Sequence, residues 1–143
     1  MKIKFVVAGD PQGKGRPRFV RTATGGRAIT PPRTRAYEDF IKWEYYRQCN
    51  YFFKDKTMLK MEIKAFFKVP ESKSKKQKEK MLNNKIRPTK KPDMDNIVKA
   101  VADALNKVAY KDDSQIVECT VKKYYDKEPR IEIYIDEIKK EME

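Results

Sequence analysis

The stretch KPDMDNIVKAVADALNK, residues 91–107, decides how the chain folds because it carries the clearest amphipathic pattern in the sequence. At about 100 degrees per residue, its apolar side chains fall on one stripe. That stripe consists of Ile97, Val101, Ala104, Leu105 and Val108, and the opposite face carries Asn96, Lys99, Asp103 and Lys107. The pattern predicts a helix with its stripe on the core and its polar face open to a ligand or solvent.

Two carboxylates, Asp93 and Asp95, stand one residue apart at the start of this stretch, in a chain of formal net charge +13. Asp95 is a suitable helix cap, and its charge is favoured at the positive end of the helix dipole. A second carboxylate gains little from capping and repels the first. A divalent cation held by both would turn that repulsion into binding. The residues alone leave both interpretations open.

The composition indicates one soluble domain with a basic surface. A chain of 143 residues is long enough to bury a core without disulfides. The net charge and a pI near 9.7 favour a polyanionic partner, with nucleic acid first and an anionic membrane second. No segment has membrane-spanning length, so we expect a cytoplasmic protein without a membrane. Cys49 and Cys119 lack metal-ligand spacing, and we expect them to be reduced thiols.

Histidine is absent from the sequence, and this excludes several chemistries. Ser/His/Asp triads, HNH-type nuclease centres and His-based zinc fingers all require it. Catalysis would have to use carboxylates, lysines, tyrosines or hydroxyls. A metal ion would have to accept oxygen ligands, which indicates magnesium or manganese.

The remaining pattern predicts the fold class. Alternating apolar residues predict four strands, at 2–8, 57–70, 116–125 and 130–136. Aromatic residues at helical spacing predict one further helix, at 34–52. Because only the short turn DKEP separates the last two strands, we expect them to pair as a hairpin. The order strand, helix, strand, helix, strand, strand predicts a single α+β domain over residues 1–143, with two main helices packed on a mixed sheet.

Two segments concentrate basic residues. Residues 9–35 hold all five glycines and seven lysines or arginines against one acid, which predicts a mobile basic loop; residues 71–91 form a lysine-rich arm containing a short polar helix. Cations on such segments would contact phosphates without reading bases, although many of the arm's lysines could simply be solvated. The predicted DNA-binding residues are Lys14, Arg16, Arg18, Arg21, Arg27, Lys90 and Lys91.

Asp112 and Asp113 add two carboxylates in the turn after the central helix. A polyanion-binding protein gains nothing from an acidic cluster unless the cluster holds a metal ion. Magnesium held by carboxylates activates water and neutralises charge on a scissile phosphate. Lys99 could stabilise the developing charge, or it could form a simple helical ion pair with Asp95 or Asp103.

The stretch KPDMDNIVKAVADALNKVAYKDDSQI, residues 91–116, resembles the core signature of RusA-like Holliday junction resolvases. In that signature a D-x-D-N-x-x-K-x-x-x-D-A-L stretch precedes a D-D-x-Q-[IV] turn. The segment from GKGRPRF to Tyr37 also resembles the family's basic loop, and the order of elements is similar to the family fold.

The resemblance implies an activity and a set of site residues. Asp93, Asp95 and Asp113 would be catalytic aspartates that bind Mg²⁺, with Mn²⁺ as a possible substitute, and Lys99 would be the catalytic lysine. The enzyme would act as a homodimer without a small-molecule cofactor. It would cut four-way DNA junctions by paired nicks, in DNA recombination and repair.

One geometric question follows from the length of the central helix. A helix from Asn96 to Lys107 is about 18 Å long, so Asp113 starts at the far end from Asp93. Either the segment after the helix folds back along it, or a partner chain supplies Asp113. Two other functions also stay open, a non-catalytic basic DNA-binding protein of a mobile element and an assembly protein.

Overall fold

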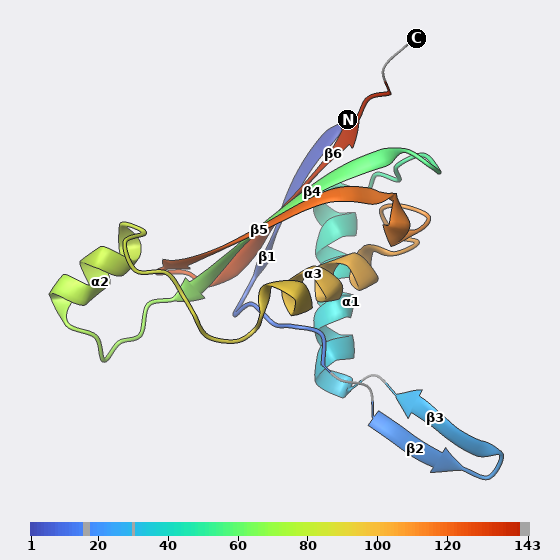
Figure 1. Ribbon diagram of the computed structural model, residues 1–143, viewed down its shortest axis with the longest axis horizontal. Coiled ribbons are helices and arrows are strands. Elements are labelled where there is room, and N and C mark those ends of the chain that lie inside the picture. Colours follow the sequence, from blue (N-terminus) through green and yellow to red (C-terminus); the bar gives the residue numbers. More distant parts are fainter. Residues whose placement is uncertain (16–17, 30, 141–143) are drawn as a thin grey trace.

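A four-stranded mixed sheet forms the centre of the computed structural model, which describes residues 1–15, 18–29 and 31–140 (Figure 1). Its strands are β1 (Lys2–Ala8), β4 (Met58–Lys68), β5 (Ile116–Asp126) and β6 (Arg130–Ile138). They lie in the order β1-β6-β4-β5, and only β4 and β5 run parallel to each other. The predicted α+β class with a mixed sheet is confirmed.

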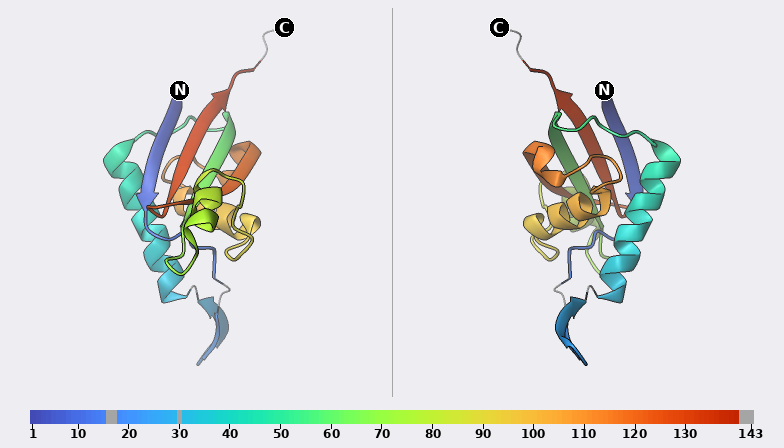
Figure 2. Two further views of the ribbon diagram at one scale, coloured as in Figure 1. Left: turned by 90° about the vertical axis from the view of Figure 1, so that its left-hand side faces the viewer. Right: turned by 90° about the vertical axis from the view of Figure 1, so that its right-hand side faces the viewer.

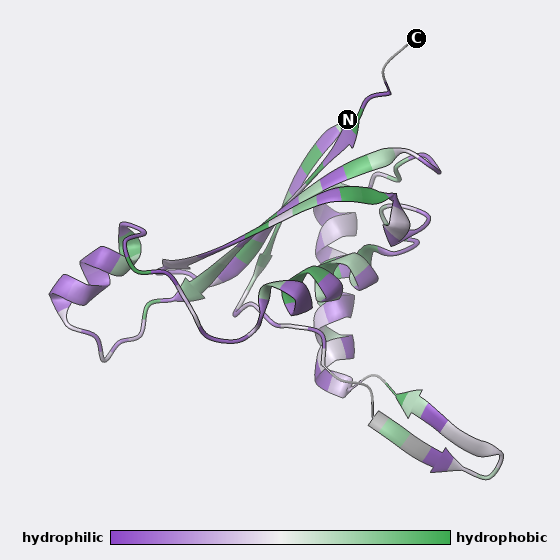
Figure 3. Cartoon of the chain, in the orientation of Figure 1, coloured by the Kyte–Doolittle hydropathy of each residue, from purple (hydrophilic) through white to green (hydrophobic). Residues whose placement is uncertain are grey.

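The core lies on one face of this sheet. Alternate side chains of β1, β4 and β6 point into it, as the period-two pattern requires. Helices α1 (Pro32–Gln48) and α3 (Met94–Leu105) supply most of the rest of the same buried cluster, and Phe53, Ala109 and Tyr110 from the connecting segments complete it. Figure 3 shows the hydrophobic colour concentrated on α3 and along the strands. The predicted stripe of α3 is buried at Ile97, Val101, Ala104 and Leu105, which confirms the amphipathic pattern.

The predicted hairpin of the last two strands is wrong. β4 lies between β5 and β6 and pairs with both of them. β5 follows a helical crossover from β4, and such a connection brings it back parallel to β4. With one side of β4 occupied by β5, the other side is left for β6, which pairs with it antiparallel. Residues 127–129 therefore pass across the end of β4 instead of forming a hairpin turn.

Helix α1 is shorter than predicted because it ends at Gln48. Two residues later Asn50 has a positive φ of 47°, which an α-helix does not allow. The buried side of α1 is aromatic, as expected, with Tyr37 and Tyr45 in the core together with Phe53 from the following loop. Trp43 of the same helix is 67% exposed. Phe40 and Tyr46 of the same helix are also exposed.

The segment 9–35, predicted as an irregular loop, contains a two-stranded hairpin of β2 (Arg18–Thr22) and β3 (Gly25–Ile29). The doublet Gly25–Gly26 beside the turn is the signal that could have indicated it, since Gly25 has a φ of +131°. The short polar helix predicted in the lysine-rich arm is confirmed as α2 (Lys75–Leu82). In Figure 1 the hairpin and α2 extend from opposite sides of the body.

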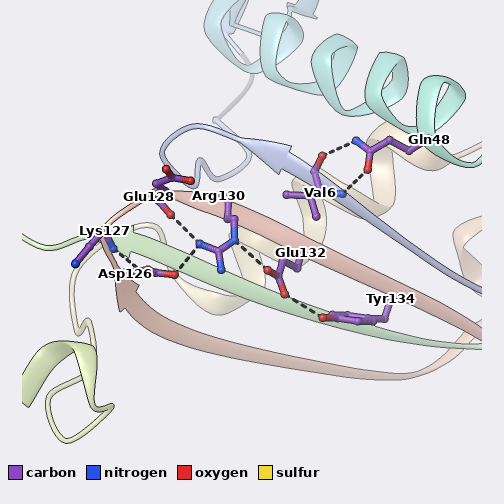
Figure 4. Close-up of polar contacts among 8 residues, drawn as sticks. All are labelled: Val6, Gln48, Asp126, Lys127, Glu128, Arg130, Glu132 and Tyr134. Carbon is purple, nitrogen blue, oxygen red and sulfur yellow. Dashed lines mark hydrogen bonds and ion pairs between the residues drawn. The ribbon is translucent and has the colours of Figure 1, made fainter.

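The other face of the sheet carries charged and aromatic side chains. Arg130 donates hydrogen bonds to Asp126 at 2.8 Å and to Glu132 at 2.9 Å (Figure 4). Its guanidinium also lies over the ring of Phe66. At the outer edge of β1, the side-chain amide of Gln48 accepts a hydrogen bond from the N–H of Val6 and donates one to its carbonyl oxygen. Gln48 therefore pairs with this edge as another strand would. None of the helices in the described residues has the length and apolar character needed to cross a bilayer.

The observed sheet order predicts where a truncation is costly. Ile133 is fully buried between Phe5 of β1 and Ile63 of β4, so Ile133→Ala should lower the free energy of unfolding by about 2–5 kcal/mol. Val117 of the edge strand β5 is 54% exposed, and Val117→Ala should cost less than about 0.5 kcal/mol. Urea denaturation measures both. Equal losses for the two variants would contradict the order of strands.

Candidate active site

The start of α3 places Asp93 and Asp95 at the surface. Asp93 occupies the N-cap position, but its carboxylate accepts no capping hydrogen bond, and Asp95 lies in the first turn. Both side chains are exposed. The dipole of α3 favours negative charge at this end. The sequence analysis assigned the cap to Asp95, whereas the N-cap position is that of Asp93, whose carboxylate makes no capping hydrogen bond and remains available to a ligand.

Lys123 of β5 fixes the segment that leads into α3. Its ammonium donates to the carbonyl oxygens of Lys90 at 2.6 Å and of Pro92 at 3.0 Å. Burial lowers the pKa of Lys123, and Lys90 lowers it further, while the negative charge of Asp93 acts in the opposite direction. Lys123 thereby positions Asp93 from a neighbouring strand. The sequence analysis missed this residue, since a lysine in a strand gives no signal of such a contact.

The segment 11–15 crosses the starts of both main helices. The amide of Lys14 donates to the carbonyl oxygen of Asn96 at 3.1 Å. A Cβ added at Gly13 would lie 2.9 Å from the Cβ of Asn96, and one at Gly15 would lie 2.5 Å from Oγ1 of Thr34. Oγ1 of Thr34 accepts a hydrogen bond from the amide of Gly15. The glycines of the GKG motif therefore permit a close approach of this segment to α3 and α1.

Lys14 joins the two helices. Its ammonium lies between Glu38 of α1 and Asp103 of α3, 3.3 Å from the latter, and the side chain is only 17% exposed. Burial disfavours the charged form of Lys14. The hydrogen bonds and charges of Glu38 and Asp103 outweigh that effect and raise the pKa of Lys14. Lys14 was predicted to bind DNA, and the structure shows that its charge is already matched by two carboxylates.

A cleft of about 620 Å³ lies where these segments meet. The first turns of α1 and α3 both open into it, and the charged residues of the described chain that line it are three cations and one acid, namely Lys14, Arg33, Lys91 and Asp93. Helix N-termini and cations together favour the binding of phosphate groups. The first turn of α1 contains no acidic residue. The first turn instead carries Arg33 and Arg35, whose positive charges lie at the positive end of the helix dipole. This arrangement is unfavourable by itself and becomes favourable when an anion binds there.

Asp113 lies at the opposite end of α3, at the start of the short 3₁₀ helix η1 (Asp113–Gln115). Its amide donates to Oδ1 of Asn106 at 3.1 Å. Burial raises the pKa of Asp113, and the carboxylates of Asp112 and Asp103 raise it further. Within residues 1–15, 18–29 and 31–140, no group of three acidic or cysteine side chains could hold a metal ion. The structure therefore does not bring Asp113 together with Asp93 and Asp95 in one chain.

The sequence matches the model of a known protein family, "Endodeoxyribonuclease RusA", over residues 8–136. The chain belongs to the RusA endodeoxyribonuclease family. It is also 37% identical over 142 residues to the uncharacterized protein YqaN of Bacillus subtilis (strain 168), a match that covers 95% of this chain and 96% of that protein. The resemblance noted in the sequence is confirmed, and membership of the RusA family makes the chain an endodeoxyribonuclease.

The glutamine of the D-D-x-Q turn has a structural role in this RusA-family chain. Gln115 is 8% exposed, and its oxygen accepts hydrogen bonds from the amides of Lys111 and Asp112. Its amide nitrogen donates to the carbonyl oxygens of Lys54 and Thr57. Gln115 ties the turn that carries Asp113 to the loop before β4. The spacing of Asp112 and Gln115, which fits a capping box, could have indicated this.

The other predicted site residues are spread over the RusA-family chain. Lys99 is exposed on the polar face of α3, one turn after Asp95. Arg21 and Arg27 are exposed on the hairpin, and Lys90 and Lys91 are exposed before α3. Of Arg18 only the backbone is described, as the first residue of β2, and Arg16 lies outside the described residues. DNA binding by all these residues stays a prediction.

Replacing Asp113 should stabilise the protein at neutral pH. The pKa of its carboxyl is raised in the folded state, which means that the folded protein disfavours the ionised carboxylate. The protein is therefore more stable at low pH, where this carboxyl is protonated, and it loses that stability as the pH rises through the raised pKa. Asp113→Asn should therefore raise the free energy of unfolding at pH 7 by up to about 1 kcal/mol. The gain should vanish below about pH 3, where the aspartate is protonated in both states. Denaturation with a chelator present measures it.

Asp112→Asn is the matched control for that variant. A hydrogen bond from Ser114 lowers the pKa of Asp112, which means that the folded protein favours the ionised carboxylate. This carboxylate therefore stabilises the protein above the ordinary carboxyl pKa, and the stabilisation is lost as the pH falls and the group is protonated. The control should lower stability at pH 7. The same sign of change in both variants would contradict the electrostatics of this turn.

Removing the ammonium of Lys123 should loosen the start of α3. Lys123→Met keeps the aliphatic stem and leaves two carbonyl oxygens without their donor, at a cost of about 1–3 kcal/mol. Hydrogen exchange at the amide of Ile97, which bonds the carbonyl oxygen of Asp93 in the first turn, should become faster than global unfolding alone would allow. Lys122→Met is the control, since Lys122 pairs with Glu62 on the surface. If the control loosens α3 equally, Lys123 does not position it.

Proposed function

We propose that this protein is a magnesium-dependent, structure-specific endonuclease that resolves four-way DNA junctions by paired nicks, in recombination and repair. Family membership supports the endodeoxyribonuclease activity. The observation that carries the finer proposal is the pair of exposed carboxylates, Asp93 and Asp95, of which Asp93 lines a cleft whose other charged lining residues in the described chain are cations. Such a pair is costly in a protein of net charge +13 that binds a polyanion, unless a cation lies between the carboxylates and the phosphate.

The donor set suits magnesium. Magnesium in phosphate-processing sites is held by one or two carboxylates, several waters and substrate phosphate oxygens, so it needs no closed cage of protein ligands. Asp93 and Asp95 would hold it, and manganese could replace it because both ions accept oxygen ligands. When bound, the ion would supply an activated water and neutralise charge on the scissile phosphate.

The other residues of the cleft would hold the DNA backbone. Arg33 and Lys91, with the N–H groups at the starts of α1 and α3, face the space where a phosphate beside Asp93 would lie. Lys99 lies one turn along α3 from Asp95 and would stabilise negative charge that develops on the phosphate. We keep Asp113 as a proposed catalytic aspartate. Its position at the far end of α3 favours a role that requires the partner chain or a rearrangement on DNA.

The two basic projections suit a branched substrate. The β2–β3 hairpin and α2 extend from opposite sides of the body, so that their cations could reach duplex arms running in different directions (Figure 1). Contacts of this kind go to phosphates and carry no base sequence information. We therefore propose recognition of junction shape. A DNA substrate and two free cysteines fit a cytoplasmic location.

The test compares cleavage and binding of a labelled four-way junction. With Mg²⁺ or Mn²⁺ the protein should nick the junction at paired positions and leave a linear duplex of the same sequence intact. Asp93→Asn and Asp95→Asn should each lower the cleavage rate by about a hundredfold or more. In the presence of a chelator they should bind the junction at least as tightly as the unmodified protein, because each removes a negative charge beside the phosphates.

Asp136→Asn is the matched control. Asp136 alternates with the buried Ile135 on β6 and so lies on the face of the sheet opposite α3. It should cleave at the unmodified rate. If Asp95→Asn nicks the junction as fast as this control does, the aspartates are not the metal site and a non-catalytic role for them is favoured. Equal binding of junction and linear duplex by the unmodified protein would contradict the proposed substrate.

A further inference from the structure

Phe19 lies exposed on the β2–β3 hairpin. Its side chain is 78% exposed, which is more than the 67% of Trp43. None of the described side chains of the hairpin belongs to the hydrophobic core. In both views of Figure 2 the hairpin extends beyond the start of α1 and away from the sheet. Burial within the fold therefore does not account for a phenylalanine at this position.

The opposite strand of the hairpin defines where the ring of Phe19 lies. Phe19 pairs with Ala28, and the next pair on the same face of the hairpin is Arg21 with Gly26. A Cβ at Gly26 would overlap the ring of Phe19, so the ring lies directly over this glycine. Covering a glycine in this way supports a hairpin, but it uses only one face of the ring. The high exposure of the side chain leaves the other face open to a ligand.

The charges around Phe19 favour a nucleic acid as that ligand. Residues 11–37 contain no acid, and Arg21 and Arg27 of the hairpin are both exposed. Arg21 lies on the same face as Phe19, whereas Arg27 pairs with Val20 and lies on the other face. A ribbon of two strands fits into the major groove of DNA between the phosphate backbones. Aromatic rings among phosphate-binding cations are typical of proteins that stack on the bases of nucleic acids.

The hairpin starts and ends at the candidate active site. Gly15 before β2 and Pro31 after β3 both line the cleft that contains Asp93. Phe19 follows Gly15 by four residues, so their Cα atoms are at most about 14 Å apart. Successive nucleotides of one strand rise by about 3.4 Å along a duplex. The ring can therefore reach a base that is only a few nucleotides from a phosphate in the cleft.

We propose that Phe19 is a specificity-determining residue that stacks on a nucleobase with an exposed face at the branch point of the DNA substrate. The inference rests on the proposed function for the branched substrate but not on the metal site. In a continuous duplex each base is covered by its neighbours, and exposing a face requires unfavourable unstacking. This cost is smaller where a base is already unpaired. Stacking by Phe19 therefore favours branched DNA over linear duplex, whereas the arginines bind both.

An anionic membrane is the main alternative ligand for an aromatic residue among arginines. Membrane binding increases with the apolar area that enters the lipid. The hairpin contains one aromatic residue, Phe19, and so offers little such area. Membership of the endodeoxyribonuclease family makes DNA the better-supported ligand.

The test measures binding in the presence of a chelator, so its outcome is independent of cleavage. The probes are a labelled four-way junction, a linear duplex and single-stranded DNA. Phe19→Ala should weaken binding of the junction by about tenfold or more, as expected for the loss of one base–aromatic stack. Binding of the linear duplex should not change, because its bases have no open face. Arg21→Gln and Arg27→Gln should weaken binding of both equally, because phosphate contacts do not distinguish them.

Two further variants separate stacking on DNA from support of the hairpin. Phe19→Leu keeps an apolar side chain over Gly26 but has no aromatic face, and it should lose junction binding as Phe19→Ala does. Phe19→Tyr keeps the ring and should bind as the unmodified protein does. Phe19→Leu binding the junction at full strength would overturn the proposal.

Phe52→Ala is the matched control. Phe52 is 52% exposed and follows the far end of α1, a helix of 17 residues that is about 25 Å long. This variant should bind the junction and the linear duplex as the unmodified protein does. Circular dichroism should show that all variants are folded. An equal loss of junction binding in Phe52→Ala and Phe19→Ala would contradict a specific role of the hairpin ring.

Fluorescence reports on the stack directly. Trp43 is the single tryptophan of the sequence, so the double variant Phe19→Trp, Trp43→Phe has its only tryptophan in the hairpin. Stacking on a base should quench its emission when the junction is added, and the linear duplex should quench it less. Unchanged emission with saturating junction would overturn the proposal.

The outcomes also separate this proposal from the proposed function. Equal binding of junction and linear duplex by the unmodified protein contradicts the branched substrate. Phe19→Ala should then still weaken binding of single-stranded DNA, whose bases have open faces, and that result supports stacking. If Phe19→Ala weakens binding of neither junction nor single-stranded DNA, the proposal is overturned even when the junction is cleaved. Binding to anionic phospholipid vesicles that depends on Phe19, without an effect on DNA, overturns it as well.

Discussion

The structure depends on the burial of one face of α3. Ile97, Val101, Ala104 and Leu105 are removed from water against the sheet and α1. Each fully buried aliphatic side chain of this kind contributes about 1.5–3 kcal/mol, so the rotation of the helix about its axis is strongly fixed. The opposite face must then point outward, which places Asp95, Lys99 and Asp103 along a single line at the surface. The position of the candidate chemistry therefore follows from the packing of hydrophobic residues.

Polar contacts determine two features that the apolar packing does not, namely the path of the segment that leads into α3 and the distance between α3 and α1. Lys123 holds the carbonyl oxygens before the helix, and Lys14 joins α3 to α1 through Asp103 and Glu38. The close approach at Gly13 leaves no room for a Cβ. These contacts come from three different segments, and together they shape a cleft in which Asp93 faces cations. The first turn of α1 forms one side of this cleft.

Much of the fold could be predicted because it depends on local periodicity. The strands at β1 and β4 and the apolar stripe of α3 lie where the pattern placed them, since side-chain spacing and burial are linked directly in regular elements. The hairpin of β2 and β3 was missed because its residues do not alternate between apolar and polar. The order of β5 and β6 was predicted wrongly because strand pairing depends on which edge of β4 is already occupied, and this is not a local property.

The sequence by itself determined the chemistry available to this protein. With no histidine, any metal ion bound here would have to take oxygen ligands, and the large cationic excess favours a polyanionic partner. The motif of residues 91–116 identified the RusA family. Only the tertiary structure decided which of these residues meet. It put Asp93 in a cleft with Arg33 and Lys91, placed Asp113 at the far end of α3, and left Trp43 on the surface. The reason is physical, since residue types set what a side chain can bond, whereas distances between segments are set by how the whole core packs.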